Sequence, residues 1–339
     1  MLFADEEFDH ETVTFGRDEK RGLNAIVAIH NRSRGPAIGG CRMMAYPDET
    51  SALTDVLRLS RGMTYKCAIA DIPFGGGKAV IIGDPSTQKT RDLLHAMGDF
   101  VEQLGGRYIT SFDSGTSLED IRVISERTDH VGGIQPGSGN VSSSTAYGVF
   151  VCMQEAVRLR LGAESLDGLV IAIQGAGNVG SRLAKLVAKD GGHIVVAHID
   201  ESQARKVASE TGGDYAQNNR ILETDSDVFA PCALGGILTE ETAWNLSSPV
   251  SCGGANNQLS EDAVADALKQ RDIFYCPDYL VNAGGIIDLH YQLNEPSRDP
   301  LGRHLDSLGQ TLRECYEYTK THARSMVQAT NRVAESRIQ

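Results

Sequence analysis

The order of apolar and polar positions between residues 24 and 106 predicts strands that alternate with helices. Short apolar runs at 24–30 and 79–83 are typical of strands. After Ser51, apolar residues recur near helical spacing at Leu53, Val56, Leu57 and Met63. Acidic and capping groups precede that helix, and a second helix, 91–106, ends in two glycines. This alternation indicates an α/β domain.

Residues 145–277 show the pattern of a second α/β domain. A helix (145–161) leads to a buried strand (169–174), another helix (181–192) and another strand (193–200). That succession has the size of a βαβ unit. Three later apolar runs fit further parallel strands, at 227–232, 249–254 and 272–277. The second half therefore predicts a Rossmann-type sheet.

A segment rich in glycine and serine, 130–144, separates the two patterns. It holds four glycines, one proline and four serines, and such a composition marks a loop or linker. We therefore expect two domains, residues 1–132 and 133–339. The length of 339 residues agrees with this, because one hydrophobic core seldom serves a chain of that size.

Composition and charge restrict the classes of function. The formal net charge is −13 and the pI is near 5.2, whereas broad binding of a nucleic-acid backbone needs a basic face. We expect no nucleic-acid partner. No apolar run reaches about 18 residues, and the acidic start of the chain does not resemble a secretory signal. No membrane partner is expected either.

Cysteine and histidine usage points to a reducing compartment and no metal. The seven cysteines are scattered and form no C-x-x-C pair, which is typical of free thiols in a cytoplasmic protein. The nine histidines form no H-E-x-x-H or similar cluster, so no metal site is predicted.

The turn GAGNVG carries the dinucleotide fingerprint G-x-G-x-x-G. It follows a predicted strand and opens a predicted helix, as the fingerprint requires, so that phosphates would lie at the helix N-terminus. The turn residues expected at the cofactor are Gly175, Gly177, Asn178, Val179 and Gly180. Asp200 ends the next predicted strand, where a carboxylate accepts hydrogen bonds from the ribose and repels a 2′-phosphate. NAD is therefore favoured as the cofactor, while the nearby Arg205 leaves NADP open.

The run Gly75–Gly76–Gly77–Lys78 raises a separate question. A phosphate loop is excluded, because Ala79 stands where that motif needs Ser or Thr and Ile72 stands where it needs Gly. Burial disfavours the charged form of a lysine and so prepares it for acid–base chemistry. We interpret the glycines as giving a substrate and a nicotinamide ring access to Lys78. The apolar flanks argue against a surface lysine after a flexible turn.

These motifs resemble those of a known family. GGCRMMAYPDETSALTDVLRLSRGMTYKCAIADIPFGGGKAVIIGDP, residues 39–85, looks like the amino-acid dehydrogenases of the Glu/Leu/Phe/Val group. The resemblance continues through YITSFDSGTS, GAGNVG, FAPCALGGIL, GGANNQL and PDYLVNAGGII, and it covers nearly the whole chain. It is closest to the branch that acts on leucine, valine, phenylalanine and tryptophan.

The resemblance implies roles for individual residues. Lys78 matches the catalytic acid–base lysine, Asp113 the aspartate that exchanges protons with the amino group, and Lys66 the lysine that pairs with the substrate carboxylate. Asn257 would help to hold that carboxylate. The remaining matches border the nicotinamide or the cofactor: Thr145, Ala233 and Asn282.

The resemblance also implies a reaction and an assembly. The implied reaction is oxidative deamination, in which NAD⁺ takes the α-hydride of an L-amino acid and an imine is hydrolysed to a 2-oxo acid and ammonia. The fold would be an N-terminal α/β substrate and oligomerisation domain and a C-terminal Rossmann-type NAD-binding domain, with a cleft between them. The last helix packs back on the first domain in relatives, which are homo-oligomers from dimers upward.

The side chains expected around the substrate are mostly apolar. Ile38 precedes the Gly39–Gly40 pair at the position where the glutamate branch has a lysine, so glutamate is disfavoured. The other pocket positions, by match to the family, are Met63, Ser111, Ile286 and Leu289. The bulky Ile38 and Ile286 favour leucine, valine or isoleucine. Phe112 replaces a common glutamate, and it would either reshape the pocket or belong to the core.

Two alternatives remain open at this point, and a third is disfavoured. Phenylalanine or tryptophan could be the substrate, because about 1–3 kcal/mol per methylene separates such side chains in an apolar pocket. A sensor that binds NAD without catalysis would keep the fold and lose the chemistry. A hydroxy-acid dehydrogenase is disfavoured, since no histidine stands in a comparable motif.

Overall fold

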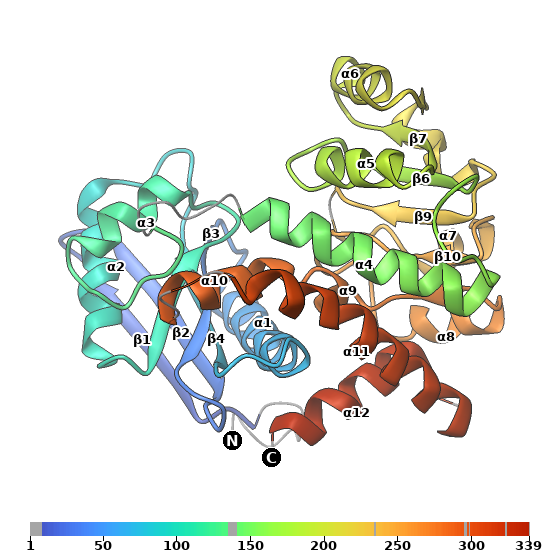
Figure 1. The fold of residues 1–339 in the computed structure, drawn as a ribbon. Helices are drawn as coiled ribbons and strands as arrows, with labels where there is room; N and C mark the ends of the chain where they lie inside the picture. Colours follow the sequence, from blue (N-terminus) through green and yellow to red (C-terminus); the bar gives the residue numbers. More distant parts are fainter. Residues whose placement is uncertain are drawn as a thin grey trace. The chain divides into compact units, whose positions relative to one another are not determined.

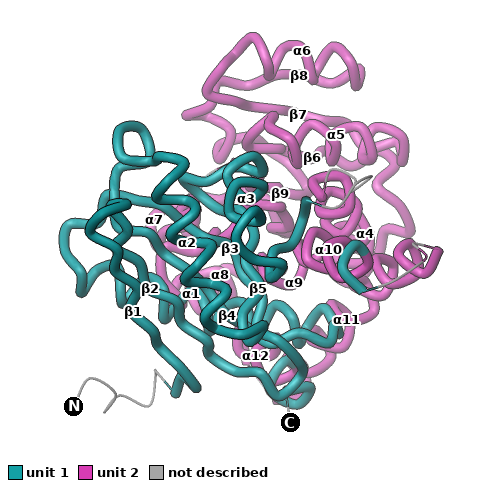
Figure 2. Tube along the Cα trace, turned by 90° about the vertical axis from the view of Figure 1, so that its left-hand side faces the viewer, with its two compact units in different colours: residues 1–138, 292–295, 334–339 teal, residues 139–291, 296–333 magenta. Residues whose placement is uncertain are grey.

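The computed structural model describes residues 9–134, 141–233, 235–294, 297, 299–322 and 324–338. The chain divides into two compact units (Figure 2). Unit 1 comprises residues 1–138, 292–295 and 334–339, and unit 2 comprises 139–291 and 296–333. Residues 135–140 of the expected linker lie outside the described residues. Its last residues, 141–144, are helical and not a loop, which corrects the prediction there.

Unit 1 is built on a five-stranded sheet with the order β1-β2-β4-β3-β5. Its strands are β1 (Thr12–Asp18), β2 (Leu23–Asn31), β3 (Ala37–Met44), β4 (Gly75–Ile82) and β5 (Tyr108–Phe112). β1 and β4 pair antiparallel with β2, whereas β3 pairs parallel with β4 and β5. The strands predicted at 24–30 and 79–83 are confirmed as β2 and β4. However, β4 already begins at Gly75, and β1, β3 and β5 were not predicted.

Helices cover both faces of this sheet (Figure 1). They are α1 (Glu49–Ile69), α2 (Arg91–Gln103) and α3 (Leu118–Ser125). The Asp48 side chain accepts a hydrogen bond from Ser51 N and so caps α1. Val56 and Leu57 of α1 pack on Val80 of β4, while α2 and α3 bury their apolar faces against the opposite side.

Unit 2 is built on a six-stranded sheet with the order β11-β10-β9-β6-β7-β8. Its strands are β6 (Val170–Gln174), β7 (His193–Ala197), β8 (Asp214–Tyr215), β9 (Val228–Pro231), β10 (Val250–Ser251) and β11 (Phe274–Tyr275). Each neighbouring pair is parallel. The order reverses between β6 and β9, which is the doubly wound arrangement of dinucleotide-binding sheets. The Rossmann-type prediction is confirmed, although β10 and β11 are shorter than expected.

Several helices of unit 2 pack on its sheet (Figure 1). The helical segments that lie wholly or mostly in unit 2 are α4 (Val141–Leu161), α5 (Gly180–Lys189), α6 (Glu201–Thr211), the 3₁₀ helix η1 (Asn218–Glu223), α7 (Glu240–Asn245), α8 (Val264–Gln270), α9 (Asp278–Val281), α10 (Gly284–Asn294), α11 (Leu301–His322) and α12 (Met326–Ile338). The core against one face comes from η1, α7 and α8. Among the described helices, none is long and apolar enough to cross a bilayer.

The end of α12, residues 334–338, belongs to unit 1. There Arg34 Nη1 donates to the carbonyl of Arg337 at 2.6 Å and Ser33 Oγ donates to that of Ile338 at 2.7 Å. In return, Arg337 donates to the carbonyl of Ile69 at 2.8 Å. These bonds satisfy carbonyl groups that helix ends leave without intrahelical partners.

Candidate functional site

Lys78 lies on β4 and forms an ion pair with Asp113, which follows the end of β5. The Lys78 side chain is only 8% exposed and that of Asp113 is 20% exposed. Arg42 of β3 approaches the same carboxylate oxygen, with 3.5 Å between its Nε and Asp113 Oδ2. Two of the residues predicted to be catalytic are therefore in direct contact and largely shielded from water.

A tight loop fixes Asp113. Its backbone N–H donates to Thr116 Oγ1 at 3.0 Å, and that hydroxyl donates to the carbonyl of Cys41 at 2.7 Å. Gly115 has φ +79°, and a Cβ there would lie 1.9 Å from the carbonyl oxygen of Met43. The sequence Asp-Ser-Gly-Thr therefore docks on the end of β3, and only glycine fits at the third position.

The charge state of Asp113 follows from these contacts. Burial alone would favour its neutral form, but the ammonium group of Lys78 and the guanidinium of Arg42 outweigh burial and hold the pKa of Asp113 below its usual value. Asp113 is therefore a carboxylate at neutral pH.

The three glycines before Lys78 lie inside the strand and contact other parts of the chain. A Cβ on Gly75 would lie 2.1 Å from the carbonyl oxygen of Asn31, and one on Gly76 would lie 2.0 Å from Thr64 N of α1. A Cβ on Gly77 would lie 2.8 Å from the ring of Tyr108. The interpretation of these glycines as access for ligands is therefore replaced by one of packing.

Gly40 lies on β3 between Lys78 and Asp113, and its lack of a side chain leaves room for their contact. It pairs with Ser111 of β5, and the flanking pairs of β3 with β4 place it opposite Lys78. A Cβ on Gly40 would lie 2.8 Å from Asp113 Cβ, and one on Gly39 would lie 1.8 Å from the carbonyl oxygen of Gly77. The Gly39–Gly40 pair thus lets strands and side chains approach closely.

The other predicted residues of unit 1 differ in exposure. Lys66 and Met63 lie one turn apart on α1 and are half-buried. Ser111 is buried, and Ile38 has no exposed surface. Phe112 is 41% exposed, so its interpretation as a core residue is wrong.

In unit 2 the glycine turn has the conformation that the fingerprint requires. Gly175 has φ +102°, which favours glycine. A Cβ on Gly180 would lie 1.8 Å from the carbonyl oxygen of Gly175, so the first turn of α5 packs directly on the end of β6. By contrast, a Cβ on Gly177 would meet nothing within 4 Å.

The residues present fit a dinucleotide. Gly177 and Asn178 are exposed, and no side chain caps the first N–H groups of α5, where Val179 is the N-cap residue. Those N–H groups can receive a pyrophosphate. Asp200 is exposed and caps α6, accepting hydrogen bonds from Ser202 that lower the pKa of the carboxylate.

Several loops meet beside the turn. A Cβ on Gly175 would lie 2.8 Å from the backbone nitrogen of Ala233, which follows β9. Asn282 is buried and donates to Asn256 Oδ1 at 2.8 Å. The glycine turn and Ala233 therefore lie together at the carboxyl ends of β6 and β9, where the strand order reverses, whereas Asp200 follows β7 and Thr145 lies on α4.

Comparison with known proteins gives the family. The model of the Glu/Leu/Phe/Val dehydrogenase dimerisation domain matches residues 10–130, and that of Glutamate/Leucine/Phenylalanine/Valine dehydrogenase matches 136–204 and 199–339. The chain belongs to this family. It is an amino-acid dehydrogenase, an oxidoreductase of the leucine, phenylalanine and tryptophan branch.

Three relatives illustrate the branch. A leucine dehydrogenase of Bacillus cereus is 41% identical over 98% of this chain and 92% of its own length. A phenylalanine dehydrogenase of Caldalkalibacillus thermarum is 42% identical over 99% and 93%. The crystal structure of L-tryptophan dehydrogenase from Nostoc punctiforme superposes with a TM-score of 0.89 at 39% identity, covering 100% of this chain and 98% of that one. Similar identities to enzymes of three substrates leave the substrate undecided. Dehydrogenases of this family are NAD(P)-dependent.

The remaining predicted residues of this dehydrogenase lie in unit 2. Ile286 and Leu289 are 8% and 6% exposed on α10. Thr145 of α4 lies close to the start of α10, because a Cβ on Gly285 would be 2.7 Å from the Thr145 hydroxyl oxygen. Asn257 is exposed, with φ +50°.

The sequence reasoning missed the partners of Arg42. Its Nη1 donates to Asp55 Oδ2 of α1 at 2.9 Å, and the Tyr46 hydroxyl donates to the same oxygen at 2.6 Å. The available signal was a charged residue two positions after Gly40, in an otherwise apolar stretch.

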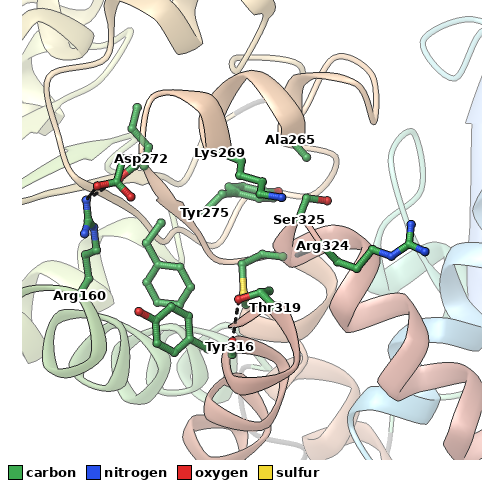
Figure 3. A pocket seen from close by; sticks show the side chains of 12 residues that line it. Arg160, Ala265, Lys269, Asp272, Tyr275, Tyr316, Thr319, Arg324 and Ser325 are labelled. Carbon is green, nitrogen blue, oxygen red and sulfur yellow. Dashed lines mark hydrogen bonds and ion pairs between the residues drawn. The ribbon is translucent and has the colours of Figure 1, made fainter. Parts of the chain in front are cut away.

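Unit 2 also contains a cavity of about 170 Å³ formed by α8, β11 and the α11–α12 region (Figure 3). Arg160, Lys269 and Arg324 supply cations, and Phe274 and Met326 supply apolar surface. Arg160 is paired with Asp272 in the same wall (Figure 3). None of the predicted site residues lines this cavity.

Among the described residues, no group of three or more His, Cys, Asp or Glu side chains could hold a metal ion.

Proposed function

We propose that this enzyme catalyses the reversible NAD-dependent oxidative deamination of an apolar L-amino acid to its 2-oxo acid and ammonia, with leucine, valine and isoleucine preferred. The observation that carries the proposal is the buried ion pair between Lys78 and Asp113. Oxidative deamination needs groups that exchange protons with an amine and with water, and this pair combines an ammonium with a carboxylate. Membership of a dehydrogenase family sets the sensor alternative aside.

Each residue of the site has a proposed task. Lys66 and Asn257 bind the α-carboxylate of the substrate. Asp113 takes and returns protons of the amino group, and Lys78 Nζ activates the water that adds to the imine carbon. The nicotinamide, when bound, accepts the hydride of the α-carbon. Shielding of Lys78 from bulk water limits proton leakage to solvent.

The proposed cofactor is NAD rather than NADP. Asp200 is a carboxylate held by Ser202, through Oδ1 at 2.9 Å from the backbone nitrogen and 2.7 Å from the hydroxyl. Arg205, which could serve a 2′-phosphate, instead pairs with Glu201 at 2.7 Å and stacks on Tyr215. These contacts support NAD, because Asp200 stays negatively charged and Arg205 already has other partners.

The proposed side-chain preference rests on the apolar positions Ile38, Met63, Ile286 and Leu289. A glutamate side chain would find no cation at Ile38, which has no exposed surface. Phenylalanine and tryptophan form the second candidate class. It is favoured by the relatives named for those substrates and by the exposure of Phe112 near Asp113.

Initial-rate measurements with each L-amino acid in turn, with NAD and then NADP, test the proposal. The expected result is NADH formation that is fastest with leucine, valine or isoleucine and slow with NADP. Faster turnover of phenylalanine or tryptophan would keep the reaction and contradict the preference. Absence of turnover on any amino acid, with NAD still bound, would contradict the proposed reaction.

We further propose a cytoplasmic homo-oligomer that assembles through unit 1. The name of the family model over residues 10–130 includes dimerisation, and Phe15 on the outermost strand β1 is 64% exposed. All seven cysteines are free thiols, as a reducing compartment requires. Sedimentation equilibrium tests the assembly, and a monomer at micromolar concentration would contradict it.

A further inference from the structure

We propose that Arg42 is a positioning residue that holds Asp113 in place and ionised while Lys78 exchanges its proton, an inference that rests on the proposed function. Arg42 lies on β3 opposite Val80 of β4, one position beyond the pair that joins Cys41 to Phe112 of β5. This register brings its guanidinium to the carboxylate that follows β5.

The first observation is that two cations share one oxygen. Asp113 Oδ2 contacts the ammonium of Lys78, and Arg42 Nε lies 3.5 Å away from it. The Arg42 Nε atom is buried and makes no hydrogen bond. A buried donor without a hydrogen bond is costly, and a small movement of the Asp113 carboxylate would satisfy it. Arg42 is thus placed to take over Oδ2 when Lys78 turns to the substrate.

The second observation is that Arg42 is itself held from the other side. Asp55 of α1 accepts its Nη1 at 2.9 Å, and the Tyr46 hydroxyl donates to the same Asp55 oxygen at 2.6 Å. The side chains of Arg42 and Asp55 are 17% and 27% exposed. Burial disfavours the guanidinium, but Asp113 and Asp55 outweigh this and raise the pKa of Arg42 above its usual value.

The chemistry requires such a permanent charge. When Lys78 gives up its proton, Asp113 loses its principal counter-ion and, being largely buried, would tend to take up the proton itself. A guanidinium cannot be deprotonated in a protein. Arg42 therefore favours a neutral amine beside a carboxylate, which is the state that the proposed reaction uses.

The Ser114 N–H donates to Asp113 Oδ1 at 2.7 Å and also favours the carboxylate, but it carries no net charge, and the titratable neighbours Cys41 and Tyr108 supply none either. Burial raises the pKa of Cys41 to about 12 and that of Tyr108 well above its usual value, so both stay neutral. Asp120, at the start of α3, is paired with Lys89 at 2.9 Å. Arg42 therefore sets how firmly the Lys78–Asp113 pair holds its proton, and Asp55 acts on the pair through Arg42.

The test is the pH dependence of kcat/KM for Arg42→Gln, Asp55→Asn and the double variant. Loss of the arginine charge makes the Lys78–Asp113 pair hold its proton more firmly. The acidic limb of the kcat/KM–pH profile of Arg42→Gln therefore moves to higher pH by about one unit. Loss of the Asp55 charge leaves Arg42 unopposed and moves the limb of Asp55→Asn to lower pH. The double variant falls between the two.

Further readouts separate this role from a structural one. We expect kcat of Arg42→Gln to fall roughly 10–100-fold, because the variant cannot form the charged hydrogen bond to Asp113 Oδ2 that Arg42 is proposed to make during turnover, with dinucleotide affinity unchanged. Arg42→Lys keeps the charge, so its limb stays near that of the wild type even where kcat falls. Limbs that coincide in Arg42→Gln, Asp55→Asn and the wild type would overturn the inference. Should Arg42→Gln fail to fold, the downward shift in Asp55→Asn still decides.

Asp113→Asn distinguishes failure of the inference from failure of the proposed function. An inactive Asp113→Asn together with unshifted limbs in the Arg42 and Asp55 variants would reject only the role of Arg42. An active Asp113→Asn would reject the proposed catalytic pair, and the inference with it.

Discussion

Gly75–Gly77 on β4 of unit 1 and Gly175–Gly180 after β6 of unit 2 are two runs of glycine beside proposed site residues. In the first run every added Cβ would meet the protein itself, as close as 2.0 Å from the backbone of α1 at Gly76. In the second run Gly175 and Gly180 make the turn tight, but Gly177 faces open space. The first run lets the chain pack on itself around Lys78, and the second leaves room for a ligand.

The difference shows what a glycine motif does and does not indicate. Glycine permits any close approach of a backbone, so its presence alone does not say what approaches. At Gly76 it is helix α1, through Thr64. At Gly177 nothing in the described chain approaches, and the uncapped start of α5 remains available to an anion.

The largest expected effect is a loss of fold stability when Gly76 is replaced. Gly76→Ala places a methyl group against the backbone of α1, so it should destabilise the fold by about 1–3 kcal/mol or more. Gly62→Ala is the matched control, because Gly62 lies in α1 itself and nothing lies within 4 Å of its Cβ position. It should stabilise by up to about 1 kcal/mol. Thermal unfolding measures both, and an unchanged Tm for Gly76→Ala would contradict the packing account.

The next effect is on binding, at Gly177. Gly177→Ala should leave the Tm of the ligand-free enzyme unchanged but weaken dinucleotide binding about tenfold, equivalent to about 1.4 kcal/mol. Fluorescence titration with NADH measures this. Wild-type affinity in this variant would mean that the pyrophosphate does not approach the turn.

A smaller effect is expected at Asp200. Asp200→Asn keeps the cap on α6, since Asn caps about as well as Asp, but removes the negative charge that we propose faces the ribose. The preference for NAD over NADP should fall several-fold, measured as the ratio of kcat/KM for the two cofactors. Glu201→Gln, which changes the neighbouring charge, should leave the ratio near that of the wild type. An unchanged ratio in Asp200→Asn would remove Asp200 from cofactor selection.

How much of this was readable from the sequence differs between the units. The β6–α5–β7 unit follows from local signals, namely a buried apolar run, a glycine turn and an amphipathic helix. β3, by contrast, contains Gly39 and Gly40, which have low strand propensity. Its pairing with β4 and β5 on either side overrides that propensity.

The same limit applies to the site. The glycines of the GGGK run were interpreted as giving ligands access to Lys78, and the strand was predicted to begin only after Lys78. Glycine is rare inside strands, and the packing of α1 explains its presence here. Lys78 and Asp113 were assigned through family resemblance, and their contact is long-range in sequence. Arg42 was missed, since its partners Asp55 and Asp113 come together only in the folded sheet.

The smallest expected effect concerns acid stability at the α1 face that Gly76 packs against. His30 Nδ1 lies 2.9 Å from Thr64 Oγ1, and burial together with the nearby His30 lowers the pKa of His10 from 6.5 to about 4. Between these values the unfolded chain binds more protons than the folded one, so stability falls as pH falls from 6.5.

The stability lost through His10 is at most about 1.4 kcal/mol per pH unit. It is smaller than this because the His10 ring is only half-buried and contacts water. His10→Asn should therefore lose less stability between pH 7 and pH 5 than the wild type, measured by denaturant unfolding at both values. Equal losses would show that His10 does not contribute.

The central claim is that the buried Lys78–Asp113 pair performs the chemistry while unit 2 binds the cofactor independently. The most direct test is the initial rate of NADH formation with saturating L-leucine in Lys78→Ala and Lys78→Arg, alongside NADH affinity. The rate should fall about 10²–10⁴-fold in both variants, since arginine keeps the charge but cannot release a proton, with affinity for NADH unchanged. A wild-type rate in either variant would contradict the claim.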